Sequence, residues 1–170
     1  TAKWQLAGGI CGYAKGAGKA SFVNCLSYAE TVSGILAAGG GIAGFVGYID
    51  SPHTFTNCAV CMAASDILYN SGPVTALSNG YYGSFFGRCT KVASLTGCYA
   101  PVGIQFGPAG GSENRGECRE MTSKEMTDGT LLELLNGNLP SGANTWVADA
   151  DGYPVIEGIP SDPDYKPGKK

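Results

Sequence analysis

The chain repeats one pattern of glycine, aromatic residues and cysteine, and this repeat constrains the fold more than any other feature. GGICGYAKGAGKASFVNCLSYA (residues 8–29) aligns with GIAGFVGYIDSPHTFTNCAVCMA (residues 41–63) and, more weakly, with YGSFFGRCTKVASLTGCYAPVG (residues 82–103). The cysteines near the ends of these segments, Cys25, Cys58 and Cys98, are 33 and 40 residues apart. A recurrence of roughly 20–50 residues is typical of solenoid proteins, so each segment is predicted to form one coil of a stack.

Each unit has an apolar stretch, a polar turn and a second stretch that contains the cysteine. β-Branched and aromatic residues favour strands, and Pro52 with its neighbours favours the turn. Two positions recur in every unit and are predicted to have a structural role. One is the glycine near the start of the unit (Gly12, Gly47 and Gly87), and the other is the cysteine near its end (Cys25, Cys58 and Cys98). The glycines would let neighbouring coils approach closely, and the cysteines are predicted to stack inward as small apolar side chains.

The predicted fold is mainly all-β, a short parallel β-solenoid with a small C-terminal helix and hairpin as a cap. Three regions are expected: a glycine-rich solenoid over 1–111, with units at about 8–34, 41–66 and 82–103; a closing module over 112–159; and a flexible tail over 160–170. The boundary rests on charge, because residues 1–112 hold three acids and five bases, whereas the remainder holds eleven acids and six bases. No segment is basic enough to favour nucleic acid as a partner.

The uncharged stretch over residues 31–49 raises the alternative of a membrane span. Its nineteen residues approach the roughly 20 that cross a bilayer. The stretch contains six glycines, however, and neither a basic cluster nor an aromatic belt flanks it. A nucleotide loop is also disfavoured, because no GxxxxGK[ST] motif occurs. We therefore expect neither a span nor a phosphate site.

The segment after Cys118 predicts a compact closing module. Thr122 and Glu125 fit a capping box, and the leucines of TLLELLNG form an apolar stripe. One short helix is expected, or two helical turns broken at residues 128–129. TWVAD and YPVIEG then predict two strands around a DADG turn. We expect this module to cover the C-terminal end of the stack, where open strand edges would otherwise be exposed.

The order of these motifs resembles the GLUG-repeat proteins of bacterial surfaces and secretions. The resemblance rests on GGICGYAKGAGKASFVNCLSYAETVSG, on GIAGFVGYIDSPHTFTNCAVCMAA, and on GCYAP followed by a helix and a W…GYP ending. It covers nearly the whole chain, and it implies a right-handed β-solenoid at the cell surface, often beside adhesive or protease modules. It implies no catalytic residues. The third unit departs from the pattern because it lacks the asparagine and the leading glycine pair.

The seven cysteines do not form a metal pattern. Cys58 and Cys61 make a CxxC pair, which could be a redox dithiol or half of a zinc site. Residues three apart on a strand point to opposite faces, so a structural role is expected for both, with no metal or cofactor. We expect the thiols to be reduced, although the strand spacing would also permit one disulfide between neighbouring coils.

The remaining polar candidates for chemistry are His53, Asp149 and Asp151. His53 is the only histidine, and its place in a polar turn after Pro52 predicts an exposed turn residue and not a catalytic base. Asp149 and Asp151 could provide two calcium ligands, but the remaining ligands of a calcium loop are missing. Both acids are therefore predicted to serve the turn.

Consecutive aromatics are the best ligand-binding candidates. On a strand, neighbours point to opposite faces, so one member of each pair should reach the surface and could stack on sugar rings. The candidates are Tyr81, Tyr82, Phe85 and Phe86.

The sequence thus predicts a non-catalytic structural or adhesive module of a bacterial extracellular protein. Its partners would be other coils, within one chain or on a second copy, and possible host or cell-wall glycans. Trp4 and Leu6 are the predicted self-association residues, because no capping helix precedes the first coil. A carbohydrate-binding module is the alternative, and a hydrolase fragment is the third hypothesis.

Overall fold

The computed structural model of the chain describes residues 6–28, 32–34, 40–61, 67–69, 72–73, 82–90, 94–103 and 118–159. Over these residues the protein is mainly β, most strands pair in parallel, and two short helices follow. The predicted mainly β class with parallel sheets is confirmed. The flexible tail predicted over 160–170 lies outside the described residues.

The strands form three successive passes of the chain. The first pass comprises β1 (Leu6–Gly8), β2 (Cys11–Ala14), β3 (Ser21–Val23), β4 (Leu26–Ser27) and β5 (Val32–Gly34). The second comprises β6 (Gly41–Ala43), β7 (Val46–Ile49), β8 (Thr54–Thr56), β9 (Ala59–Val60), β10 (Ile67–Tyr69) and β11 (Gly72–Pro73). The third comprises β12 (Tyr82–Gly83), β13 (Phe86–Cys89), β14 (Ser94–Thr96) and β15 (Cys98–Pro101), and β16 (Cys118–Met121) follows it.

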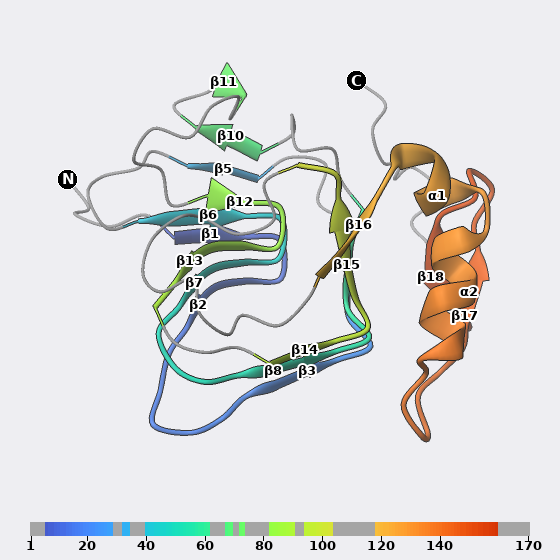
Figure 1. Ribbon diagram of the computed structural model, residues 1–170, viewed down its shortest axis with the longest axis horizontal. Helices are drawn as coiled ribbons and strands as arrows, with labels where there is room; N and C mark the ends of the chain where they lie inside the picture. The colour runs from blue at the N-terminus through green and yellow to red at the C-terminus, as the bar shows by residue number, and fades with distance from the viewer. Residues whose placement is uncertain are drawn as a thin grey trace.

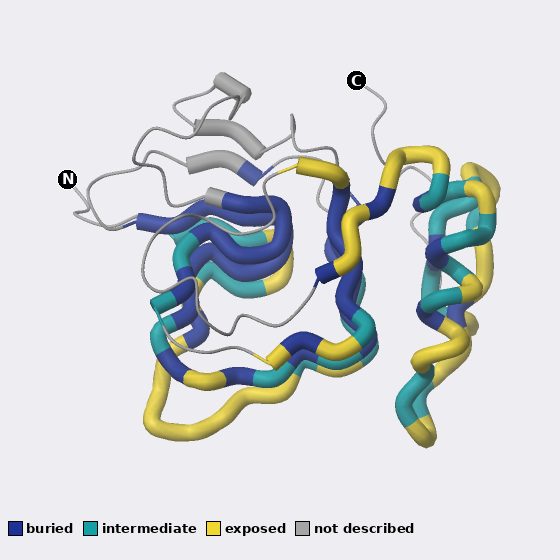
Figure 2. The backbone as a smooth tube through the Cα atoms, in the orientation of Figure 1, coloured by how far each residue is buried: buried dark blue, intermediate teal, exposed yellow. Residues whose placement is uncertain are grey.

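Corresponding strands of successive passes lie side by side (Figure 1), in the sheet orders β1-β6-β12, β13-β7-β2, β14-β8-β3 and β16-β15-β9-β4. Ser21 pairs with Thr54, and Thr54 with Ser94, which reproduces the cysteine spacing of 33 and 40 residues. Between β2 and β7 the paired residues of the first two passes are more than 33 positions apart, because Cys11 pairs with Val46. The loop over residues 15–20 is two residues longer than its counterpart over 50–53 and accounts for the difference. Figure 2 shows this longer loop exposed.

Glycine permits close contact between two sheets of the stack. Gly12, Gly47 and Gly87 share one register position, as the sequence alignment predicts. A Cβ atom on Gly47 would lie 2.7 Å from the carbonyl oxygens of Ala7 and Gly12. A side chain at this position would therefore collide with backbone atoms, which cannot move aside cheaply.

The residue before each repeated cysteine makes a left-handed corner. Asn24, Asn57 and Gly97 have φ angles of 53°, 54° and 59°. Asparagine and glycine tolerate this conformation better than other residues. This explains why the residue before the repeated cysteine is asparagine in two units and glycine in the third. Because the corner is preserved, the absence of asparagine from the third unit does not disrupt that pass.

Aromatic side chains fill the interior of the stack. Phe45 stacks on Phe85 with ring centroids 4.7 Å apart, and Phe85 meets Phe86 edge-on at 4.9 Å. Phe85 and Phe86 are both 0% exposed, so their predicted role in surface ligand binding is wrong. Phe85 lies at a bend between β12 and β13, where the alternation of a straight strand does not hold, and both rings therefore point inward.

The closing module contains the elements expected from the sequence: α1 (Ser123–Thr127), α2 (Thr130–Gly137), β17 (Trp146–Ala148) and β18 (Pro154–Ile156). Thr122 and Glu125 form a reciprocal capping box at the start of α1. Gly129, with φ of 95°, separates the two helices at the predicted break. The strands β17 and β18 pair antiparallel around the predicted turn. None of the described helices is long and apolar enough to cross a membrane.

The closing module packs on the side of the stack and not across its end (Figure 1). Its apolar side chains, including Leu131 and Leu135 of α2, join a cluster with residues from all four strands of the sheet β16-β15-β9-β4. The expectation that the module would cover the C-terminal end is therefore wrong. The outward face of this sheet is apolar, and covering it buries more hydrophobic surface than covering a strand edge would.

Candidate functional site

The first pass provides an open edge of the stack. β2, β3 and β4 each pair on one side, and no other described strand pairs with them on the other side. The Thr54 N–H donates to the Ala20 carbonyl of the first pass at 3.0 Å. Ser21 holds the register position of Thr54 one pass earlier, so its own N–H points away from the second pass. The same holds for Leu26, the register partner of Ala59. This edge therefore presents outward-facing backbone donors on β3 and β4.

Two aromatic ladders also end at this edge. The Phe22 ring stacks on Phe55 at 4.7 Å, and the Tyr13 ring stacks on Tyr48 at 4.8 Å. Stacking covers one face of each first-pass ring. The Nζ of Lys15 lies 5.8 Å from the centroid of the Tyr13 ring. A further pass would continue both ladders.

The Tyr13 hydroxyl is held by a carboxylate of the next pass. It donates a hydrogen bond to Asp50, and this bond raises the pKa of Tyr13 to about 12. The Arg88 guanidinium lies 4.8 Å from the centroid of the Tyr48 ring. Because its pKa is raised, the Tyr13 phenol stays protonated near neutral pH.

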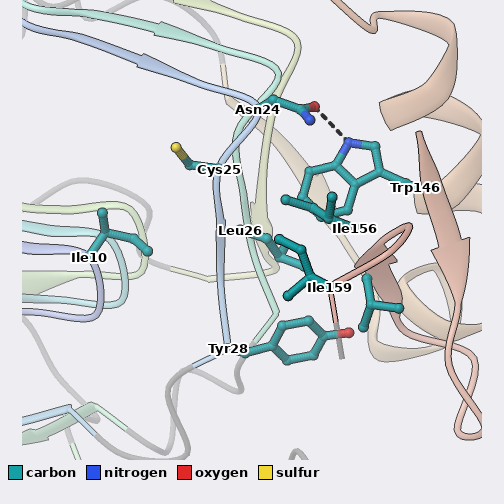
Figure 3. A pocket seen from close by; sticks show the side chains of 9 residues that line it. Ile10, Asn24, Cys25, Leu26, Tyr28, Trp146, Ile156 and Ile159 are labelled. Atoms are coloured by element: carbon teal, nitrogen blue, oxygen red, sulfur yellow. Dashed lines mark hydrogen bonds between the residues drawn. The ribbon is translucent and has the colours of Figure 1, made fainter. Parts of the chain in front are cut away.

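An apolar groove of about 350 Å³ lies between the first pass and the closing hairpin (Figure 3). Its lining residues are Ile10, Asn24, Cys25, Leu26, Tyr28, Trp146, Val155, Ile156 and Ile159. Ile10 and Ile159 are 42% and 58% exposed. The lining contains no ionisable carboxylate or amine, so the groove suits an apolar surface better than a charged ligand.

Asparagine side chains fasten the closing module beside the groove. The Trp146 indole N–H donates to Asn24 Oδ1 at 2.7 Å, as drawn in Figure 3. Asn57 Nδ2 donates to the same oxygen at 2.8 Å and to the Leu135 carbonyl at 2.9 Å. The two corner asparagines thus hold both the hairpin and α2. Sequence reasoning identified neither these contacts nor the groove, which joins residues more than a hundred positions apart.

The repeated cysteines form a ladder inside the stack. Cys58 and Cys98 are buried, whereas Cys25 is partly buried and lines the groove. Cys58 and Cys61 belong to different clusters on the two sides of β9, as their spacing predicts. All seven cysteines of the chain are thiols in this structure.

The remaining binding and self-association candidates are described only in part. Trp4 and Tyr81 lie outside the described residues, and Tyr82 is described only as a member of β12. Leu6 is partly buried on β1, where it pairs with Gly41.

The expectation of an exposed His53 is wrong. His53 is 3% exposed, and its Nδ1 accepts a hydrogen bond from the Ala20 N–H at 2.9 Å. Ser51 and His53 of this turn are buried and hydrogen-bonded to the first-pass loop at Gly16 and Ala20, whereas Pro52 is exposed. Asp149 accepts hydrogen bonds from the N–H groups of Asp151 and Tyr153 at 3.0 and 2.8 Å, which is the structural role predicted for a turn acid.

The groove and edge can offer backbone pairing, apolar contact and one thiol. Within the described part of the chain, no group of three or more His, Cys, Asp or Glu side chains could hold a metal ion. His53 does not line the groove. Comparison of the chain with protein-family models, with curated proteins and with solved structures finds no match.

Proposed function

We propose that this chain is a right-handed β-solenoid module with a structural, adhesive role at a bacterial cell surface, and that it acts through the open edge of its first pass. The parallel pairing of three passes at nearly constant register supports the solenoid assignment. The occupant proposed for the edge is a second copy of this chain, because two first-pass edges expose the same alternating backbone N–H and C=O groups and can pair with each other.

The single observation that carries the proposal is the row of backbone groups that face away from the stack. Between the second and third passes, the Asn57 N–H donates to the Thr96 carbonyl at 2.8 Å. One pass earlier, the Asn24 N–H donates to the Thr56 carbonyl at 2.9 Å. The carbonyl at this position of the first pass, on Val23, accepts no backbone N–H among the described residues, and its one contact there is with Cys25 Sγ at 3.2 Å. An added strand could supply the N–H found at this position between inner passes.

Exposed apolar side chains beside the edge would stabilise the dimer in addition to the backbone hydrogen bonds. Val23 on β3 is 44% exposed, and Ile10 at the groove is 42% exposed. Pairing of two edges would bury both, and each buried apolar side chain contributes about 1.5–3 kcal/mol at most.

A symmetric dimer fits the two ends of the stack better than a filament does. At the opposite end β12, β13 and β14 also lie at the ends of their sheets, but β16 occupies the outer side of β15, so β15 has no free side for a first-pass strand. Two first-pass edges can instead meet around a two-fold axis, which closes the assembly.

The test compares two valines of similar exposure on strands. Val23→Asp places a charge at the edge, whereas the control Val147→Asp places one on β17, where Val147 is 38% exposed. In light scattering, the wild type and the control should dimerise with increasing concentration, and Val23→Asp should remain monomeric. Leu6→Asp is expected to weaken the dimer as well. A wild type that stays monomeric at millimolar concentration, or equal dimerisation of the two valine variants, would refute the proposal.

A further inference from the structure

Cys25, Cys58 and Cys98 occupy one position in three consecutive passes. The Cys58 Sγ lies 3.4 Å from the Phe22 carbonyl, and the Cys98 Sγ lies 3.6 Å from the Phe55 carbonyl. Each inner thiol therefore reaches back to the pass before it. Parallel strands are about 4.8 Å apart, within the Cα separation that a disulfide accepts.

Access to this ladder is graded along the stack. Cys58 and Cys98 are 0% and 2% exposed, whereas Cys25 is partly buried and opens to the groove. In Figure 3 the Cys25 side chain points away from Leu26 and Trp146, to the side of the strand on which Ile10 lies. Cys25 is the member of the ladder that lines the groove, so a small solute there meets Cys25 before the buried Cys58.

The pair also has the electronic character of a reactive dithiol. The hydrogen bond from the Cys58 thiol lowers the pKa of Cys25 to about 6. The same hydrogen bond, a second one with Cys98, and burial raise the pKa of Cys58, and the contact with Cys58 lowers the pKa of the buried Cys98 as well. The thiolate is the nucleophilic form of cysteine, so Cys25 is the attacking sulfur and Cys58 is held protonated until it reacts.

We propose that Cys25 and Cys58 form a peroxide-reactive dithiol at the groove, with hydrogen peroxide as the oxidant. The Cys25 thiolate attacks one oxygen of the peroxide, the O–O bond breaks, and the leaving hydroxide takes up a proton to form water. Cys25 becomes a sulfenic acid, oxidised by two electrons, while the peroxide is reduced. Cys58 then attacks the Cys25 sulfur, the S–O bond breaks, and hydroxide leaves with the Cys58 proton as a second water. One disulfide forms from two thiols and one peroxide.

The first experiment treats the reduced full chain with one equivalent of hydrogen peroxide. Mass spectrometry should show the loss of two hydrogen atoms, and cleavage after Phe55 should leave two peptides joined through Cys25 and Cys58. The Cys98→Ser control should form the same bridge. A bridge between other cysteines, such as Cys98 and Cys118, which pair in register, would overturn the proposal.

Variants of the pair identify the order of attack. Cys58→Ser should stop at the Cys25 sulfenic acid, which dimedone captures. Cys25→Ser should leave Cys58 as a thiol under the same conditions, because Cys58 is buried. Circular dichroism should confirm that both variants are folded. If folded Cys58→Ser gives no dimedone adduct at Cys25, the proposal fails.

Alkylation measures the reactivity of Cys25 in the unaltered chain. Cys11 is also partly buried but lies outside the ladder, so it serves as an internal control. A lower pKa increases the fraction of Cys25 that is thiolate but makes that thiolate a weaker nucleophile. When both effects are taken together, iodoacetamide should modify Cys25 roughly tenfold faster than Cys11 near pH 6. Equal rates would contradict the assignment of Cys25 as the attacking sulfur.

Discussion

Replacement of Asn57 tests the left-handed corner and the contact with the closing module together. Asn57 is 0% exposed, has φ of 54°, and donates through Nδ2 to Asn24 Oδ1 and to the Leu135 carbonyl. Alanine removes both hydrogen bonds and also strains the backbone. Glycine removes the same bonds, but it adopts this φ freely.

The two substitutions should therefore differ in a defined direction. Each lost hydrogen bond costs about 1 kcal/mol, and the buried Leu135 carbonyl left without this donor costs about 1 kcal/mol more. The left-handed conformation costs alanine a further 1 kcal/mol or so. We expect Asn57→Gly to lower the free energy of unfolding by about 3 kcal/mol and Asn57→Ala by about 4 kcal/mol.

Urea denaturation followed by circular dichroism measures both values at one chain concentration. Ser94 provides the control, because it is exposed on the extended strand β14. There the order should reverse, with Ser94→Gly less stable than Ser94→Ala, since glycine loses more backbone entropy in a strand. If Asn57→Ala is as stable as Asn57→Gly, the backbone argument is refuted.

Three other substitutions test separate parts of the fold. Gly47→Ala should destabilise the protein by several kcal/mol, because its Cβ would collide with backbone carbonyls, whereas Gly18→Ala, with no atom within 4 Å, should leave the melting temperature nearly unchanged. Hydrogen bonds from Thr122 hold the pKa of the Glu125 carboxyl below its usual 4.5. The ionised carboxylate therefore stabilises the fold fully above pH 4.5, and this stabilisation is lost as the pH falls through the lower folded-state pKa. Glu125→Gln should have a lower urea midpoint than the wild type at pH 7 and the same midpoint at pH 2. Trp146→Phe should cost about 1 kcal/mol in the same assay through loss of its indole bond, and an unchanged stability would show that this bond contributes nothing.

The repeat made the strand register predictable from sequence. Because Cys25, Cys58 and Cys98 align with their preceding asparagine or glycine, the pairing of three passes followed directly. The capping box and the glycine break were predictable because they depend on neighbours within a few residues. The register could be predicted because the sequence repeats, and the cap and the break because local sequence specifies them.

The errors arose where the stacked passes alter the environment of a residue. Alternation in a straight strand placed one of Phe85 and Phe86 outside, but a bend between two sheets turns both inward. His53 sits in a polar turn, yet the first-pass loop that ends at Ala20 buries it. The groove could not be predicted, because it depends on which face of the stack the closing hairpin occupies.

The bond between Trp146 and Asn24 spans 122 residues, and this distance has a consequence for synthesis. The ribosome makes the first pass first, but the corner at Asn24 gains its last partner only when the hairpin has emerged. Contacts this distant in sequence form late, because closing a long loop costs entropy before the contact is gained. Of the three passes, the first to be made is therefore the last to be completed. Until then, its strand edge and the thiol of Cys25 face the surroundings of the nascent chain without the hairpin beside them.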